Sequence, residues 1–256
     1  MSQRSDDLAA MKEKVHKLLA LARDRQGTPE GETFENKAFE LMAKYGVSAA
    51  ALAAEGASAH GAGAHAGSSQ IKRHKQEFNG AYSDMQFALF NGLSAALHCC
   101  TLRFKVRGSV RVEEAIMFGR PHHVDRVIML HGLLVSHMLA GAYDASRPAR
   151  VVGISVQTQR RSWMTGFVAS VCERLADIER AHAVEYSTEN TAGTLVLQSD
   201  EKLAMAAAAA EFPHAHSSRM GRRRLDPNSF ASGAATGETM DLGQTRVSHR
   251  RALTRR

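Results

Sequence analysis

The chain has few of the residues that build disulfide-stapled or fibrous proteins. Of its 256 residues, three are cysteine and five are proline. Cys99 and Cys100 are adjacent and Cys172 stands alone, so no disulfide framework is expected. Such sparse cysteine use predicts a reducing cytoplasm as the location. With 44% hydrophobic and 23% charged residues, the composition is that of a soluble globular protein.

Long apolar runs and targeting segments are also missing. The first seven residues, MSQRSDD, lack the apolar core of a signal peptide. The longest apolar stretch, residues 128–143, is interrupted by His131, Ser136 and His137. It is too short and too polar to cross a bilayer, so we expect no membrane partner.

Local motifs of catalysis, cofactor binding and metal binding are absent as well. There is no G-x-S-x-G elbow, no phosphate-binding P-loop and no dinucleotide fingerprint. Neither H-E-x-x-H nor C-x-x-C occurs, and none of the four histidines between His122 and His137 is four residues from another. The sequence therefore predicts no catalytic residue, no cofactor and no metal site. A catalytic site assembled from distant residues stays open.

Positive charge is concentrated at one end of the chain. Residues 1–218 carry 24 basic and 23 acidic side chains, whereas residues 219–256 carry nine and three, which is +6 (9 − 3) of the total +7. Clustered arginine of this kind indicates contact with nucleic acid or another polyanion. A solubilising tail is the alternative interpretation. The nine basic residues are all arginine: Arg219, Arg222, Arg223, Arg224, Arg246, Arg250, Arg251, Arg255 and Arg256.

The first 54 residues are expected to form a small helical module. Apolar residues recur at three- and four-residue steps from Leu8 to Ala22, which predicts an amphipathic helix that ends at Gly27. Thr28 is a suitable N-cap for a second helix, with Pro29 at its first position. A module of this size lies near the lower limit for independent stability, so it fits a docking unit.

The rest of the chain predicts a larger α+β domain with a small, hairpin-based sheet and several helices. Residues 55–76, rich in Gly, Ala, Ser and His at their start, are expected to be a flexible linker to this domain, residues 77–218. Residues 219–256 form an arginine-rich segment with a last helix. The expected elements are a helix over 82–97, strands over 100–106 and 110–118 that turn at Gly108-Ser109, a helix from Pro121, a helix over 159–183, a strand over 194–197, and helices over 202–210 and 228–242.

Two further sets of cations fit phosphate contacts. Arg103, Lys105 and Arg107 alternate on the polar face of a predicted strand at intervals of about 7 Å, close to the phosphate repeat of one DNA strand. Arg160 and Arg161 stand where a helix is expected to begin, and an anion there would use free backbone N–H groups. Both sets also fit ordinary solvated surface positions.

The segment KVHKLLALARDRQGTPEGETFENKAFELMAKYGVS (Lys14–Ser48) resembles the N-terminal domain of an actinobacterial, phage and plasmid family of unknown function. That family's pattern runs K-LLALA, then G-T-P-E, then a helix ending in L-M-K-Y-G-L-S. Gly31 departs from it, because an acidic residue or alanine is expected there. Some members are labelled ArdK-like transcriptional inhibitors, so the resemblance implies a DNA-associated regulatory role in mobile elements. The larger domain that commonly follows in this family is matched by Phe118–Val135, Arg160–Leu175, Thr194–Gln198 and Phe230–Leu242.

The sequence thus predicts a cytoplasmic, non-catalytic nucleic-acid-binding protein that acts as an accessory or in transcription regulation, with DNA as the expected partner. A protein–protein adaptor with a basic tail is the first alternative, in which the N-terminal helices bind the partner. A cryptic enzyme such as a nuclease is the second. The residues predicted to contact the nucleic-acid backbone are Arg222, Arg223, Arg224, Arg160, Arg161, Arg103, Lys105 and Arg107.

Overall fold

The chain folds as an α+β protein that divides into two compact units. The computed structural model describes residues 2–25, 28, 30–31, 33–34, 37–38, 41, 71–105, 108–146, 153–189, 192–216, 224–240 and 242. One unit comprises Met1–Ala54 with Asp241–Arg256, and the other comprises Glu55–Met240. The expected linker over 55–70 lies outside the described residues.

The first unit contains the predicted N-terminal helix, α1 (Ser2–Asp24). Val15 and Ala22, two turns apart on one face, are both buried. Thr28 acts as the predicted cap, because its hydroxyl accepts the Gly31 N–H at 3.1 Å. A Cβ at Gly31 would overlap the Arg25 carbonyl oxygen, which explains glycine at this position.

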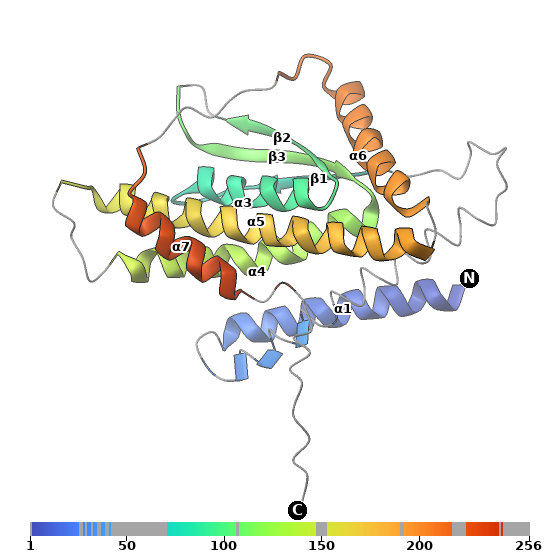
Figure 1. Ribbon diagram of the computed structural model, residues 1–256, viewed down its shortest axis with the longest axis horizontal. Helices are drawn as coiled ribbons and strands as arrows, with labels where there is room; N and C mark the ends of the chain where they lie inside the picture. Colours follow the sequence, from blue (N-terminus) through green and yellow to red (C-terminus); the bar gives the residue numbers. More distant parts are fainter. Residues whose placement is uncertain are drawn as a thin grey trace, which may run out of the picture. The chain divides into compact units, whose positions relative to one another are not determined.

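The second unit is built on a three-stranded antiparallel sheet in the order β1-β3-β2 (Figure 1). Strands β2 (Cys100–Lys105) and β3 (Val112–Gly119) form the predicted hairpin. Gly108 in their connection has a φ of 73°, a conformation that favours glycine. Strand β1 (Lys72–Glu77) was not predicted, because residues 72–76 were assigned to the linker.

Helix α6 (Ala192–Glu211) covers one face of this sheet. Its Ala204 and Ala208 pack with Ile116 and Phe118 of β3. The predicted strand over 194–197 is wrong, since these residues belong to α6. A short apolar run of this kind cannot be assigned to a strand or to a buried helix by periodicity alone.

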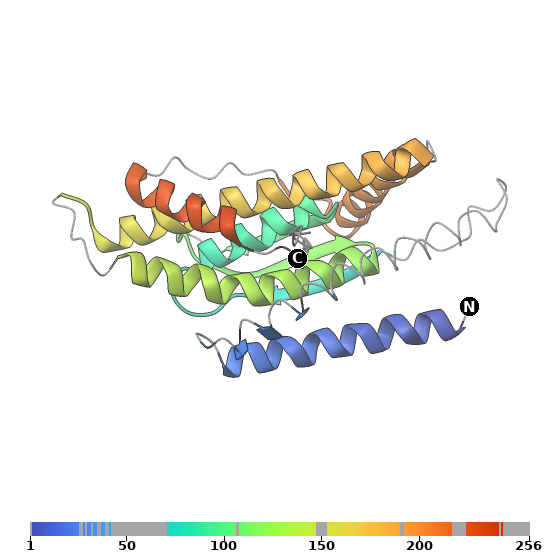
Figure 2. The same ribbon diagram turned by 60° about the horizontal axis from the view of Figure 1, so that its bottom comes forward.

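The opposite face of the sheet meets a layer of helices. Helices α3 (Ser83–Ala96) and α4 (Pro121–Ala145) contact the strands, α5 (Val156–Glu189) packs on both of these helices, and α7 (Pro227–Thr239) packs on α5 (Figures 1 and 2). Proline stands in the first turn of α4, as the sequence predicts. Among the described residues, α4 alone is long and apolar enough to cross a membrane, but Val124, Leu134 and Met138 along it are fully buried in this core.

Helices α5 and α7 approach each other through glycine. A Cβ at Gly166 would overlap the Phe230 carbonyl oxygen, and a Cβ at Gly233 would overlap that of Trp163. The close packing that the F-x-x-G-x-x-x-G spacing of α7 indicates is therefore present. Trp163 itself is buried, only 3% exposed, and it is the sole tryptophan of the chain.

Replacing Gly233 with alanine is expected to destabilise the protein. In an open helix this change would add about 1 kcal/mol of stability. Here the added Cβ forces α7 away from α5, so we expect a net loss of about 1–3 kcal/mol in the free energy of unfolding. Urea unfolding followed by Trp163 fluorescence measures the loss. The matched variant Ser232→Ala, at an exposed position next to it, should show no loss.

The core under the sheet contains a buried histidine. His131 of α4 is 6% exposed and packs edge-on against the rings of Phe78 and Phe90. Burial lowers the pKa of His131 from 6.5 to about 4. The folded protein therefore contains neutral His131 at pH values where the unfolded chain already binds a proton.

This burial predicts acid sensitivity. As the pH falls from about 6.5 towards 4, the unfolded chain gains a proton on His131 that the folded chain does not accept, so the free energy of unfolding falls. Between pH 7 and pH 5 the contribution of His131 is about 2 kcal/mol. The variant His131→Phe should lose that much less stability over this interval in urea unfolding. His216→Gln, at an exposed position, should behave like the natural sequence, and equal behaviour of both variants would contradict the assignment.

Candidate functional site

The structure describes four of the eight predicted contact residues in full. Arg107, Arg222 and Arg223 lie outside the described residues, as does the side chain of Lys105. Arg224 is exposed and directly precedes the capping region of α7. The other three, Arg103, Arg160 and Arg161, lie in the second unit and are half-buried.

Arg103 lies on a covered face of the sheet. In the register of β2 with β3 it stands opposite Ala115, which is fully buried. Met117 lies on the same face, and Ser94 of α3 donates to its sulfur at 3.1 Å. The polar face of the predicted hairpin is therefore packed against helices around Arg103 rather than fully open to solvent.

Arg160 and Arg161 do not stand at the end of their helix. Helix α5 begins at Val156, three residues before the predicted start, so both arginines lie in its second turn. The hydroxyl of Ser155 already accepts the Thr158 N–H at 3.1 Å, which satisfies one free backbone donor of this terminus. The two arginines thus lie one turn beyond the backbone groups invoked for an anion site.

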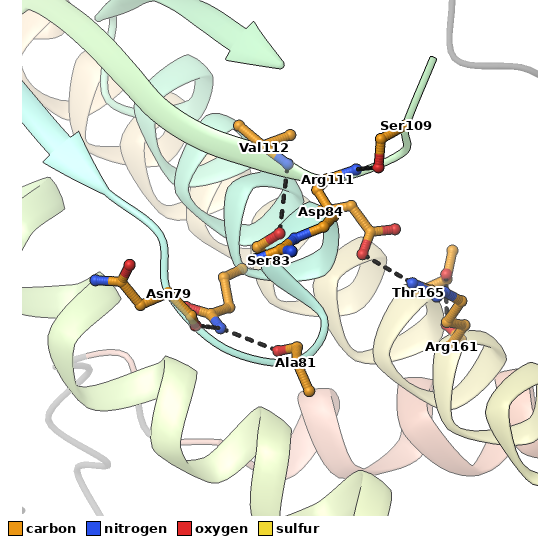
Figure 3. Close-up of polar contacts among 10 residues, drawn as sticks. Asn79, Ala81, Ser83, Asp84, Ser109, Arg111, Val112, Arg161 and Thr165 are labelled. Carbon is orange, nitrogen blue, oxygen red and sulfur yellow. Dashed lines mark hydrogen bonds and ion pairs between the residues drawn. The ribbon is translucent and has the colours of Figure 1, made fainter. Parts of the chain in front are cut away.

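Intramolecular partners occupy both of these side chains. Arg161 donates to Oδ1 of the buried Asp84 at 3.1 Å (Figure 3) and lies over the Tyr82 ring. Arg160 donates to the Ser146 hydroxyl at 2.9 Å, and its guanidinium carbon lies 3.8 Å from the centre of the Tyr143 ring. These contacts join the start of α5 to α3 and α4.

Hydrogen bonds at the start of α3 fix the backbone that carries Asp84. The Ser83 hydroxyl accepts the Val112 N–H of β3 at 3.3 Å. The Gln86 amide donates to the carbonyl oxygens of Asn79 and Ala81 at 3.0 and 3.2 Å. Figure 3 shows these contacts converging on the turn from which Asp84 reaches Arg161.

Other cations of the second unit are also paired with carboxylates. Lys72 contacts the buried Asp125 at 2.7 Å, and Arg126 binds Glu179 through two hydrogen bonds. Each of these carboxylates comes from a different element than its cation. Further pairs of this kind are Arg73 with Glu211, Lys75 with Glu114, and Arg120 with Asp200.

The segment before α7 is anchored to the folded unit. The buried Asp226 caps α7 by accepting the Ser229 N–H at 3.0 Å, and its own N–H donates to the Ser162 hydroxyl at 2.8 Å. Hydrogen bonds from Ser229 lower the pKa of Asp226. The arginine cluster at 222–224 therefore precedes a fixed point of the chain.

A group of potential metal ligands lies where α4 and α6 meet. One ligand atom from each of His122, His123 and Asp200 lies within 4.8 Å of the others. Arg120 holds the Asp200 carboxylate through Oδ1 at 2.8 Å, and Oδ2 lies 3.8 Å from Nε2 of His123. The ring centre of His98 is 5.8 Å from that of His123.

His123 is buried in this cluster without hydrogen bonds. It is 3% exposed, and neither ring nitrogen has a hydrogen-bond partner. Burial lowers the pKa of His123 to about 2, so the ring is neutral at pH 7. Burial also raises the pKa of the Cys99 and Cys172 thiols to about 12, which leaves both without the thiolate character of a nucleophile.

Sequence patterns did not indicate this cluster. His122 and His123 are adjacent rather than one helical turn apart. Asp200 follows almost 80 residues later, between the strand expected over 194–197 and the helix expected over 202–210. The one available signal was a pair of histidines directly after Pro121, at the first turn of a predicted helix.

The comparisons with known proteins identify only the N-terminal segment. A family described as a protein of unknown function (DUF2786) matches residues 10–49. This agrees with the resemblance of Lys14–Ser48 to a family of unknown function. No curated protein and no solved structure matches the chain.

The two neighbouring arginines of α5 are expected to differ in their contribution to stability. Arg161→Met leaves the buried Asp84 carboxylate without its guanidinium partner, which costs about 3 kcal/mol in the free energy of unfolding. Arg160→Met removes one hydrogen bond and one ring contact, which costs about 1 kcal/mol. Urea unfolding of the two variants measures the difference. Equal losses would show that the Asp84 pair contributes no more than the Tyr143 contact.

Proposed function

We propose that this protein binds nucleic acid without catalysis, and that the arginines of residues 219–256 carry the binding. The cluster Arg222, Arg223 and Arg224 is the first contact with the phosphate backbone. Arg103, Lys105, Arg107, Arg160 and Arg161 are at most secondary contacts in this proposal. DNA is the expected polymer.

The distribution of charge carries this proposal. Residues 219–256 hold +6 of the total charge of +7. Earlier in the chain, in contrast, Lys72, Arg120, Arg126 and Arg161 are paired with buried or half-buried carboxylates, so these cations are used within the fold. Phosphate binding needs cations whose charge is not already neutralised, and the C-terminal segment has three times as many basic as acidic residues.

The anchor at α7 suits such a role. Asp226 holds the chain to Ser162 directly after the cluster, so bound nucleic acid would be held close to the folded unit. Arg224, the member of the cluster that the structure describes, is exposed. A basic segment tied to a fixed point searches a smaller volume than a free tail, which raises its effective concentration at a bound duplex.

The biological setting follows from the resemblance of the sequence. A family with members labelled ArdK-like transcriptional inhibitors suits a cytoplasmic regulatory or accessory protein of a phage, a plasmid or an actinobacterium. In that setting the arginines of residues 219–256 bind DNA, and the N-terminal helices dock a protein partner.

Binding to a labelled DNA duplex should fall steeply with salt. Fluorescence anisotropy of the full chain, at salt concentrations between about 50 and 200 mM, gives the slope of log affinity against log salt. Each phosphate contact adds about 0.9 to the magnitude of that slope. The triple variant Arg222→Gln, Arg223→Gln, Arg224→Gln should therefore reduce it by about 2–3.

A second triple variant removes the same charge from the folded unit. Arg73, Lys75 and Arg111 are exposed, and their replacement by glutamine should leave the slope nearly unchanged. Equal loss in both variants would contradict a special role of the C-terminal arginines. Absence of binding at about 50 mM salt would overturn nucleic-acid binding altogether and favour the protein–protein adaptor.

A further inference from the structure

A buried histidine without partners is the starting observation. His123 is 3% exposed and both of its ring nitrogens lack hydrogen bonds. Leaving a buried polar atom unsatisfied costs about 1–3 kcal/mol, so folded proteins rarely retain one without a reason. At 3.8 Å, Nε2 of His123 is too far from Oδ2 of Asp200 for a hydrogen bond.

The spacing of the neighbouring groups fits an ion between them. Ligand atoms of His122, His123 and Asp200 lie within 4.8 Å of one another. A tetrahedral metal ion at about 2.0–2.2 Å from each ligand would draw these atoms together by at most about 1.5 Å. We propose that His122, His123 and Asp200 bind one divalent transition-metal ion of the zinc type.

The donor set selects the class of metal. Two imidazole nitrogens and one carboxylate oxygen suit Zn²⁺, Co²⁺ or Ni²⁺, whereas Mg²⁺ and Ca²⁺ prefer sites built from oxygen. Three protein ligands leave a coordination position for water or a small anion. His122 is half-buried, unlike the other two ligands, so this position has a side towards solvent.

The surroundings orient the ligands. Arg120 binds Oδ1 of Asp200 and leaves Oδ2 directed at His123, which is the kind of outer contact that fixes a metal-binding carboxylate. The other nearby guanidinium, Arg126, is paired with Glu179. Glu179 therefore offsets the charge of Arg126, and the Asp200 carboxylate is shared between Arg120 and the bound ion.

The ion would join two parts of the second unit. His122 and His123 belong to the first turn of α4, and Asp200 belongs to α6, which covers the far face of the sheet. Binding would tie α6 to α4 just beyond the end of β3 and stabilise this arrangement. This inference is independent of nucleic-acid binding by the C-terminal arginines.

The test uses the full chain, stripped of metal with a chelator and titrated with Zn²⁺ or Co²⁺. We expect one equivalent to bind, with Co²⁺ giving the absorption spectrum of a low-coordinate nitrogen–oxygen site. At a hundredfold excess of Zn²⁺ over the dissociation constant, the midpoint of thermal unfolding should rise by roughly 5–10 °C. Mg²⁺ should produce no shift.

Two variants and a matched control decide the assignment. His122→Gln, at a half-buried position, should fold and should weaken Zn²⁺ binding at least tenfold, and His123→Asn should do the same where it folds. His214→Gln with His216→Gln removes two exposed histidines and should leave binding unchanged. The proposal is overturned if neither metal binds at micromolar concentration, if binding survives in His122→Gln, or if the control variant loses it equally.

Discussion

The second unit is organised by the need to neutralise charge that folding removes from water. Asp84, Asp125 and Asp200 are all buried, and each is met by a cation from a different element. A buried carboxylate without such a partner would destabilise the fold by several kcal/mol, so these contacts restrict how α3, α4, α5, α6 and β1 can be arranged. His123, by contrast, is a neutral ring buried beside Asp200, and neither of its nitrogens has a hydrogen-bond partner.

The same constraint explains which sequence predictions succeeded. Helices α3 and α4 and the β2–β3 hairpin are marked by apolar periodicity and by Pro121, and these local signals agree with the fold. Strand β1 has no apolar residue in KRHKQE, so apolar periodicity cannot mark it. Its register is set by pairing with β3 and by carboxylates distant in sequence. The role of Arg161 was hidden for the same reason, since its partner Asp84 lies 77 residues earlier. Charge pairs between distant elements leave no periodic trace in a sequence.

The two functional proposals depend on different parts of the charge pattern. Nucleic-acid binding is assigned to the arginines beyond residue 218, where basic residues outnumber acidic ones by nine to three. The metal site is assigned to a place inside that network where two imidazoles and one carboxylate converge. Such an ion would hold α6 on the sheet, and the basic segment would extend from the anchored start of α7. The protein would then combine a folded scaffold with a segment that binds a polyanion.

The edges of the small sheet bear on the behaviour of the protein at high concentration. In the order β1-β3-β2, no strand in the described part of the chain lies beside the outer side of β1, so one row of its backbone groups has no neighbouring strand there. Edges of this kind invite pairing between molecules, and charged side chains discourage it. Every side chain of β1 is polar or charged, with Arg73, Lys75 and Glu77 exposed. The polar sequence of β1, which removes the apolar periodicity that would mark a strand, therefore also protects the folded chain against aggregation through this edge.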